Sequence, residues 1–196
     1  MKLQTRQVGI FAALVLLMAS TRLYGHLGSS ASLPDASWAV FFLAGFYLAR
    51  LSWPAVAAFV FLLLEAGGVD YYAIVFRGVS DTCFSPAYWF MIPTYASLWY
   101  GGRWFAARQQ MKWANLGTLA AAVWGSTTVA FLISNASYYL LSDLFVKLSP
   151  VQYAARVAQY YPQYLACTML YLACAALLHV LLVNLSNTTD HSSEHV

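Results

Sequence analysis

Long apolar stretches, separated by short polar connections, constrain this chain more than any other feature. Runs such as 8–24, 115–141 and 156–183 reach or exceed the range of about 17–25 residues that a helix needs to cross the hydrocarbon core of a bilayer. Within a bilayer, backbone N–H and C=O groups must be satisfied inside the segment, and a helix does this for runs of such length. The pattern predicts an all-α, polytopic integral membrane protein.

Composition agrees with this class and excludes others. Of the 196 residues, 61% are hydrophobic and 9% are charged, whereas an average soluble domain has roughly 25% charged residues. A formal net charge of +3 is too small and too scattered for a nucleic-acid surface. We expect one transmembrane domain over residues 1–185 and a polar, disordered tail over 186–196.

We predict about six transmembrane helices. The polar connection 67–85 between the third and fourth has an apolar island at 73–76, which we interpret as a re-entrant or interfacial piece. The expected spans cover 8–24, 37–49, 54–64, 86–103, 115–141 and 156–183.

Two local patterns predict how these helices are shaped and packed. Pro93 lies inside the expected fourth span, where proline kinks a helix. Gly117, Ala121 and Gly125 recur at four-residue intervals in the fifth span. Such a ridge of small residues lets another helix approach closely.

Lysine and arginine set the expected orientation, because their excess stays on the cytoplasmic side. With both termini cytoplasmic, the inner segments hold six of these residues and the outer connections three. Asp35, Asp70, Asp81 and Asp143 then fall on the outer side, together with Cys83. We therefore expect polar chemistry at the outer face.

Sequence motifs of soluble enzymes are missing from the chain. There is no G-x-x-x-x-G-K, H-E-x-x-H, G-x-G-x-x-G or G-x-S-x-G pattern. His26 and His179 are too far from each other in sequence to form a local zinc set with Cys83. We therefore expect neither an ATP-hydrolysing site nor zinc catalysis.

Tyrosine gathers on one side of the expected topology. Ten of the 14 tyrosines fall toward the outer end, near Asp70, Asp81 and Asn135. An aromatic belt is the simpler explanation, although such belts populate both interfaces. The alternative is an outward pocket, in which rings and hydrogen-bonding groups bind a large amphipathic ligand.

Three further residues stand out. Cys83 comes just before the helix start expected at Pro86, where a helix N-terminus and nearby Arg77 favour a thiolate, a soft metal ligand. The alternative interpretation is that Cys83 is an incidental loop cysteine without a role in binding. Arg22 and Glu65 lie inside expected spans and need partners, either in a structural ion pair or in ligand contact.

Two stretches carry a resemblance to a known family. They are R-G-V-S-D-T-C-F-S-P-A-Y-W-F (Arg77–Phe90) and F-L-I-S-N-A-S-Y-Y-L-L-S-D (Phe131–Asp143). With about six spans and no nucleotide site, the chain resembles the solitary cobalamin S components of energy-coupling-factor transporters, the BtuM family. The resemblance covers nearly the whole chain.

The resemblance implies a multi-pass protein of the bacterial inner membrane that takes up cobalamin (vitamin B12) or a related corrinoid. The family's loop cysteine falls on Cys83, which would bind cobalt and promote ancillary removal of a cyanide axial ligand. Ala12, Ala13 and Ala19 do not form the A-x-x-x-A face with which S components dock on a shared energy-coupling module. The candidate ligand-binding residues are Asp70, Tyr71, Tyr72, Arg77, Asp81, Phe84, Tyr88, Asn135, Tyr138, Tyr139 and Tyr160.

Other classes of function remain open at this point. Heme or another metal chelate would suit the same surroundings nearly as well as a corrinoid. A membrane-embedded thiol or redox enzyme would use Cys83 as its nucleophile. A structural membrane subunit would need only the ridge of small residues. A coloured ligand that co-purifies with the protein would separate the binder from the last two.

Overall fold

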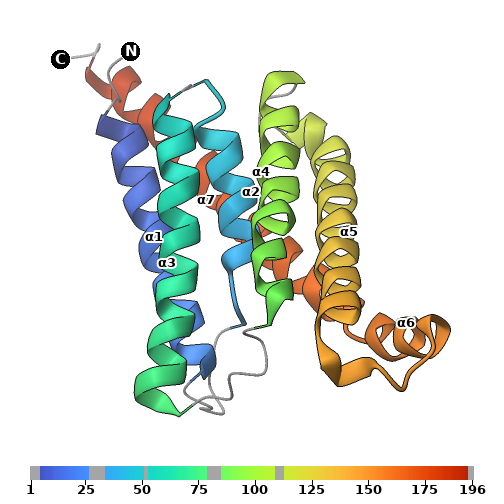
Figure 1. Cartoon of the computed structure of the whole chain (residues 1–196). Helices are drawn as coiled ribbons and strands as arrows, with labels where there is room; N and C mark the ends of the chain where they lie inside the picture. Colours follow the sequence, from blue (N-terminus) through green and yellow to red (C-terminus); the bar gives the residue numbers. More distant parts are fainter. Residues whose placement is uncertain (1–4, 27–33, 51–52, 79–84, 109–112, 194–196) are drawn as a thin grey trace.

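The computed structural model describes residues 5–26, 34–50, 53–78, 85–108 and 113–193, and these ranges are helical with short turns between them. Figure 1 shows α1–α5 side by side, α7 crossing obliquely behind them and the short α6 lying across one end, with α1 beginning and α7 ending at the other end. The α-helices (α) and 3-10 helices (η) are α1 (Thr5–His26), α2 (Ser37–Tyr47), α3 (Trp53–Arg77), η2 (Pro86–Phe90), α4 (Met91–Arg108), η3 (Trp113–Asn115), α5 (Leu116–Leu141), η4 (Asp143–Phe145), α6 (Pro150–Ala158) and α7 (Tyr161–Ser193).

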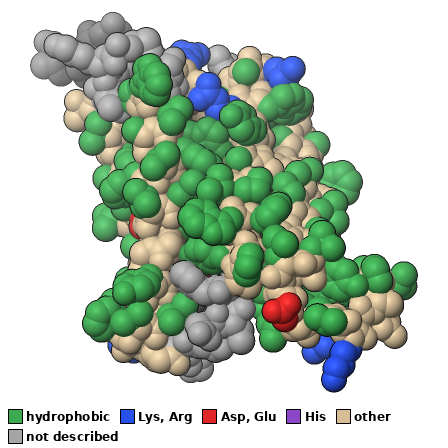
Figure 2. Space-filling model, in the orientation of Figure 1, with side chains coloured by type: hydrophobic (Ala, Val, Ile, Leu, Met, Phe, Trp, Pro, Cys, Tyr) green, Lys and Arg blue, Asp and Glu red, His purple; other side chains and the backbone are tan. Residues whose placement is uncertain are grey.

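Four of the described helices are long and apolar enough to cross a membrane, in agreement with the expected class of protein. They are residues 5–23 of α1, α3, α5 and residues 161–179 of α7. Large apolar side chains cover the middle of the molecule, and Lys and Arg lie mainly at its two ends (Figure 2). Leu16 is 69% exposed and Leu140 74%. A surface this apolar fits a lipid environment better than water.

The short helix α2 is the centre of the bundle. It has 11 residues, and eight of them are buried. It packs mainly against α4 and also touches α1, α3 and α7. Phe41 of α2 stacks on Tyr95 of α4 with ring centroids 4.1 Å apart, and Phe42 is fully buried.

Glycines allow α2 and α4 to pack with their backbones in contact. A Cβ atom added to Gly45 of α2 would overlap the Trp99 carbonyl, and one added to Gly102 of α4 would overlap the Phe42 carbonyl. A Cβ on Gly101 would come within 2.6 Å of the Ser126 Cβ on α5. The close approach therefore needs glycine on both helices.

The small-residue ridge predicted on α5 does not pack within the described bundle. A Cβ on Gly117 or Gly125 would meet nothing within 4 Å, and Ala121 is exposed. No described helix approaches this ridge closely, because the buried face of α5 instead carries Val123, Thr127 and Ala130.

The prediction of a polar connection over 67–85 is wrong for its first part, up to residue 77. α3 continues without interruption through Gly67 and Gly68 to Arg77, so 73–76 is a helical segment and not a re-entrant piece. Glycine in a helix interior costs about 1 kcal/mol relative to alanine. Here the helix is held by burial of Ala66 and Ala73, and by an ion pair at Asp70.

Three other expected boundaries are corrected. Pro93 is the third residue of α4, where a missing N–H breaks no intrahelical bond, so it is not an interior kink. The segment expected to start the last span at Arg156 is the separate helix α6, and Pro162 at the second position of α7 favours a new helix start. α7 then continues through most of the tail to Ser193, because no proline or glycine follows Pro162.

We predict that Gly102→Ala destabilises the protein by roughly 1–3 kcal/mol, because the added methyl group must push apart two backbones. Gly125→Ala is the matched control on the neighbouring helix. It should leave stability unchanged or slightly higher, since its methyl group enters open space. Thermal unfolding in detergent measures both. Equal melting temperatures for the two variants would contradict the close contact.

Candidate functional site: an ion-pair network beside an aromatic cavity

A buried ion pair joins α1 to α3. Arg22 Nε donates to Asp70 Oδ1 and Arg22 NH2 donates to Asp70 Oδ2, both at 2.7 Å. The two side chains are only 12% and 13% exposed. Two parallel, charge-assisted bonds of this kind fix distance and orientation together. The expectation that Arg22 finds a partner is confirmed.

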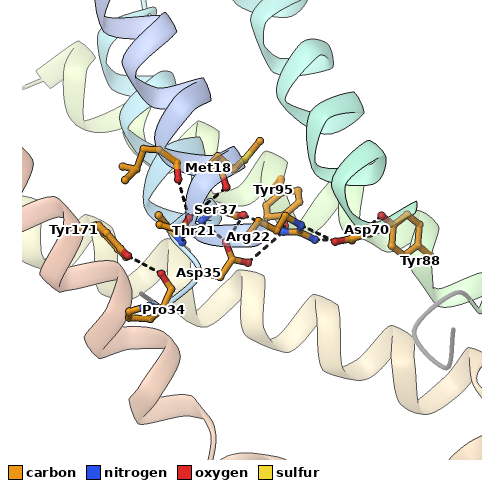
Figure 3. Close-up of polar contacts among 12 residues, drawn as sticks. Met18, Thr21, Arg22, Pro34, Asp35, Ser37, Asp70, Tyr88, Tyr95 and Tyr171 are labelled. Atoms are coloured by element: carbon orange, nitrogen blue, oxygen red, sulfur yellow. Dashed lines mark hydrogen bonds and ion pairs between the residues drawn. The ribbon is translucent and has the colours of Figure 1, made fainter. Parts of the chain in front are cut away.

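The same guanidinium reaches α2 and α4. Arg22 NH1 donates to Ser37 Oγ at 2.9 Å, to the Tyr95 hydroxyl oxygen at 3.0 Å and to Asp35 Oδ2 at 3.2 Å. Asp35 also accepts from the Ser37 backbone N–H at 2.9 Å, one of the N–H groups in the first turn of α2 that have no partner within the helix. Figure 3 shows these contacts converging on Arg22. One side chain thus connects four helices.

Tyr88 extends the network to η2. Its hydroxyl donates to Asp70 Oδ2 at 3.0 Å. Burial and the adjacent Asp70 carboxylate raise the pKa of Tyr88 above its ordinary value, because both disfavour a phenolate. Tyr88 therefore stays a hydrogen-bond donor across the physiological pH range. Pro86 begins this short helix at a first-turn position and so places Tyr88.

An open cavity of about 570 Å³ lies beside the network, at the end of the bundle opposite the start of α1. Ligand pockets are commonly about 300–1,000 Å³. The cavity is lined by Arg22, Asp35, Trp38, Ala87, Tyr88, Phe90, Met91, Thr94, Tyr95, Ser134, Asn135, Ser137, Tyr138, Phe145, Tyr153, Arg156, Val157, Tyr160 and Tyr164.

Aromatic contacts hold the far wall of the cavity. Tyr153 of α6 packs against Phe145 at 4.9 Å between ring centroids and against Tyr139 at 4.8 Å. Its hydroxyl donates to the Asn135 carbonyl at 3.1 Å. Burial raises the pKa of Tyr153, so this donor also stays protonated. Trp38 and Tyr164 close another side, with centroids 4.7 Å apart.

The short helix α6 is built to carry Tyr153. Ser149 accepts from the Gln152 N–H and the Gln152 side chain accepts from the Ser149 N–H, a reciprocal capping box, with Pro150 at the first position. The Tyr139 hydroxyl donates to the Leu148 carbonyl at 2.9 Å and fixes the preceding turn. The local sequence around Ser149 therefore places Tyr153 in the far wall of the cavity.

The structure brings some of the expected site residues together and separates others. Tyr88, Asn135, Tyr138 and Tyr160 line the cavity, while Asp70 lies behind it in the ion pair and Tyr139 behind Tyr153. Tyr71, Tyr72 and Arg77 are exposed on α3 and do not line it. Asp81, Cys83 and Phe84 lie outside the described residues.

Several cavity residues were missed by sequence reasoning. Arg22 was noted for its charge but not assigned to a site, and Asp35 was placed only at the outer face. Trp38, Tyr95 and Arg156 were not singled out as ligand contacts, whereas Tyr153 and Tyr164 belong to the group of tyrosines expected near an outward pocket. Two signals pointed here: the gathering of tyrosines on one side and a charged residue inside an apolar span.

The described residues contain no group of three or more His, Cys, Asp or Glu side chains that could hold a metal. The two described cysteines, Cys167 and Cys174, are free on α7. The cavity offers rings, hydroxyls, one side-chain amide, one carboxylate and two guanidinium groups, a set that suits a large ligand with apolar faces and polar edges. No protein-family model and no curated protein matches the chain.

We predict that Asp70→Asn lowers the free energy of unfolding by roughly 3–5 kcal/mol, because it removes the main counter-charge of buried Arg22. Asp35→Asn is the control. It should change stability by about 1 kcal/mol or less, since Asp35 is 46% exposed and asparagine also caps helices. Chemical or thermal unfolding in detergent tests the pair. A smaller loss for Asp70→Asn than for Asp35→Asn would show that Asp35 is the dominant partner.

Proposed function

We propose that the protein binds cobalamin or a related corrinoid in this cavity and serves as a substrate-binding component for its uptake across the bacterial inner membrane. The observation that carries the proposal is the cavity itself, with aromatic walls and a few polar groups beside a fixed ion-pair network. The resemblance of Arg77–Phe90 and Phe131–Asp143 to the solitary cobalamin S components supports the same assignment.

The chemistry of a corrinoid matches the cavity lining. A corrin ring has broad apolar faces, which rings such as Trp38, Tyr138 and Tyr160 can contact. Its rim carries amides, for which Asn135 and Ser134 offer hydrogen-bonding groups. Because the cavity is open on one side, a ligand larger than about 570 Å³ can enter in part.

In this proposal Cys83 supplies an axial ligand to the cobalt of the bound corrinoid. Cys83 comes two residues before Ser85, which precedes η2, and Ala87, Tyr88 and Phe90 of η2 line the cavity. A thiolate is a soft ligand that suits cobalt. Coordination by Cys83 would displace an axial group, so a cyanide-bearing corrinoid would lose its cyanide on the protein.

Titration of the purified protein with cyanocobalamin, followed by visible absorption, tests the proposal. The parent protein should bind and shift the spectrum. Cys83→Ser should keep part of the affinity and lose the shift, because a serine hydroxyl is a hard oxygen donor. If Cys83→Ser gives the same bound-state spectrum as the parent protein, Cys83 is not a ligand of the cobalt.

The cavity wall is tested in the same titration. Tyr160→Ala should weaken binding roughly two- to tenfold, the range that one hydrogen bond of about 0.5–1.5 kcal/mol provides. Leu140→Ala is the control, because Leu140 is 74% exposed and does not line the cavity. No binding by the parent protein would favour a thiol enzyme or a structural subunit. Equal affinities of Tyr160→Ala and Leu140→Ala would show that the ligand does not bind at the cavity wall formed by Tyr160.

We also propose six crossings with both termini in the cytoplasm, so that the cavity faces outward. α2 and α4 would complete the six, and the end where the chain starts carries Arg6, Arg50, Arg103 and Arg108. An energy-coupling module is a candidate partner, although α1 lacks the A-x-x-x-A face with which S components dock on it.

Single cysteines introduced into a cysteine-free background test this orientation in intact cells. A membrane-impermeant thiol reagent should label Val146→Cys, a position that is 80% exposed near the cavity end, and should not label Arg108→Cys. The reverse pattern would invert the topology and place the cavity on the cytoplasmic side.

A further inference from the structure

Glu65 is a second ionisable group inside the bundle that the network does not use. It is at the centre of α3, twelve residues from either end of the helix that spans 53–77. Both carboxyl oxygens are buried and have no hydrogen-bond partner among the described residues. The Ala19 backbone on α1 is the nearest polar group and weakly favours the charged form, but it does not form a hydrogen bond of normal geometry with Glu65. Its helix neighbours Leu62 and Ala66 are fully buried.

An ionised carboxylate in this position would be expensive. Moving an unpaired charge into an apolar medium costs far more than moving a neutral group, and the group neutralises instead. Within a bilayer the same cost applies to aspartate and glutamate near the centre of a helix. The orphaned oxygens therefore favour the neutral acid.

The charged groups that face Glu65 do not offset this cost. Arg22 of α1 is the charged side chain among the described residues that acts on Glu65, and its attraction is smaller than the cost of burial. Asp70, on the same helix as Glu65, is bound to Arg22 and to Tyr88. α2 packs on α3 but has no charged residue, and its one tyrosine, Tyr47, is at the far end. The Arg22 hydrogen bonds go to Asp70, Asp35, Ser37 and Tyr95. Because Arg22 already binds two carboxylates, it offers a third one only weak stabilisation.

We propose that Glu65 is a proton-binding site in the membrane-spanning part of the protein. Release of this proton would place a third carboxylate near Arg22 and compete with Asp70 for it. Because Arg22 also lines the cavity, the proton on Glu65 and the shape of the cavity are linked through one side chain. This site goes beyond corrinoid binding and does not depend on the identity of the ligand.

A hydrophobic carbodiimide tests the site directly, because such reagents partition into apolar surroundings and react with a protonated carboxyl group. Full-length protein in membranes is treated with dicyclohexylcarbodiimide, and modified residues are identified by peptide mass spectrometry. Glu65 should be modified and Asp70 should not, and the yield at Glu65 should fall as pH rises. Glu65→Gln should lose the adduct completely.

A water-soluble carbodiimide with an amine nucleophile provides the matched control. It should modify Asp35, which is 46% exposed, and leave Glu65 unmodified. No Glu65 adduct in membranes at neutral pH, equal modification of Asp70, or a yield that does not change with pH would each overturn the proposal. Peptide mapping of the parent protein decides the outcome even if Glu65→Gln does not fold. Cobalamin takes no part, so this result is independent of the titrations above.

Thermal unfolding in detergent provides a second readout. A proton that the folded state binds and the unfolded state releases makes stability fall as pH rises. Glu65→Gln replaces the neutral acid with a neutral amide and should flatten this dependence. An unchanged pH dependence in Glu65→Gln would show that another group is responsible and would contradict the proposal.

Discussion

The bidentate pair between Arg22 and Asp70 is the interaction on which the cavity end of the molecule depends. It joins α1 to α3 at 2.7 Å, and the remaining bonds of the guanidinium reach α2 and α4. Loss of one partner would leave a charge with little access to water, which is far costlier than loss of an exposed pair. The network therefore restricts four helices to one arrangement, and Tyr88 adds η2 to it.

The glycine contacts of α2 and α4 complement that network by fixing how closely the helices approach. Hydrophobic packing alone accepts a range of distances, whereas backbones in contact at Gly45 and Gly102 accept very little change. The result is a rigid body on one side of the cavity. The opposite wall, from α5 to α7, relies on aromatic contacts such as Tyr139 with Tyr153 and on a capped short helix. Any widening of the cavity would start in this second wall, since it has fewer charged contacts.

Sequence reasoning found those features whose cause is local. The apolar runs predicted the bounds of α1 and α5 to within a few residues, and the charge of Arg22 inside a span predicted that it has a partner. The course of α3 past Gly67 could not be foreseen, because the group that neutralises Asp70 is 48 residues away in sequence. The face of α5 that is buried could not be foreseen either: spacing shows which residues share a face but not which helix covers it. The pattern predicts that ten of the 14 tyrosines lie toward the outer side of the membrane. Only contacts in space separate Tyr138, which lines the cavity, from Tyr71, which is on the surface.

Asp70 and Glu65 show how environment, rather than residue type, decides the state of a carboxyl group. They are five residues apart on one helix, yet Asp70 accepts bonds from Arg22 and Tyr88 while the oxygens of Glu65 have no hydrogen-bond partner among the described residues. The chain has seven Asp and Glu residues, and three of them, Asp35, Asp70 and Glu65, belong to the surroundings of a single arginine. One cation can stabilise a limited number of anions in a medium of low dielectric constant. A third acid beside Arg22 is therefore stabilised by a bound proton, and whatever changes the bonds of Arg22 must also change the affinity for that proton.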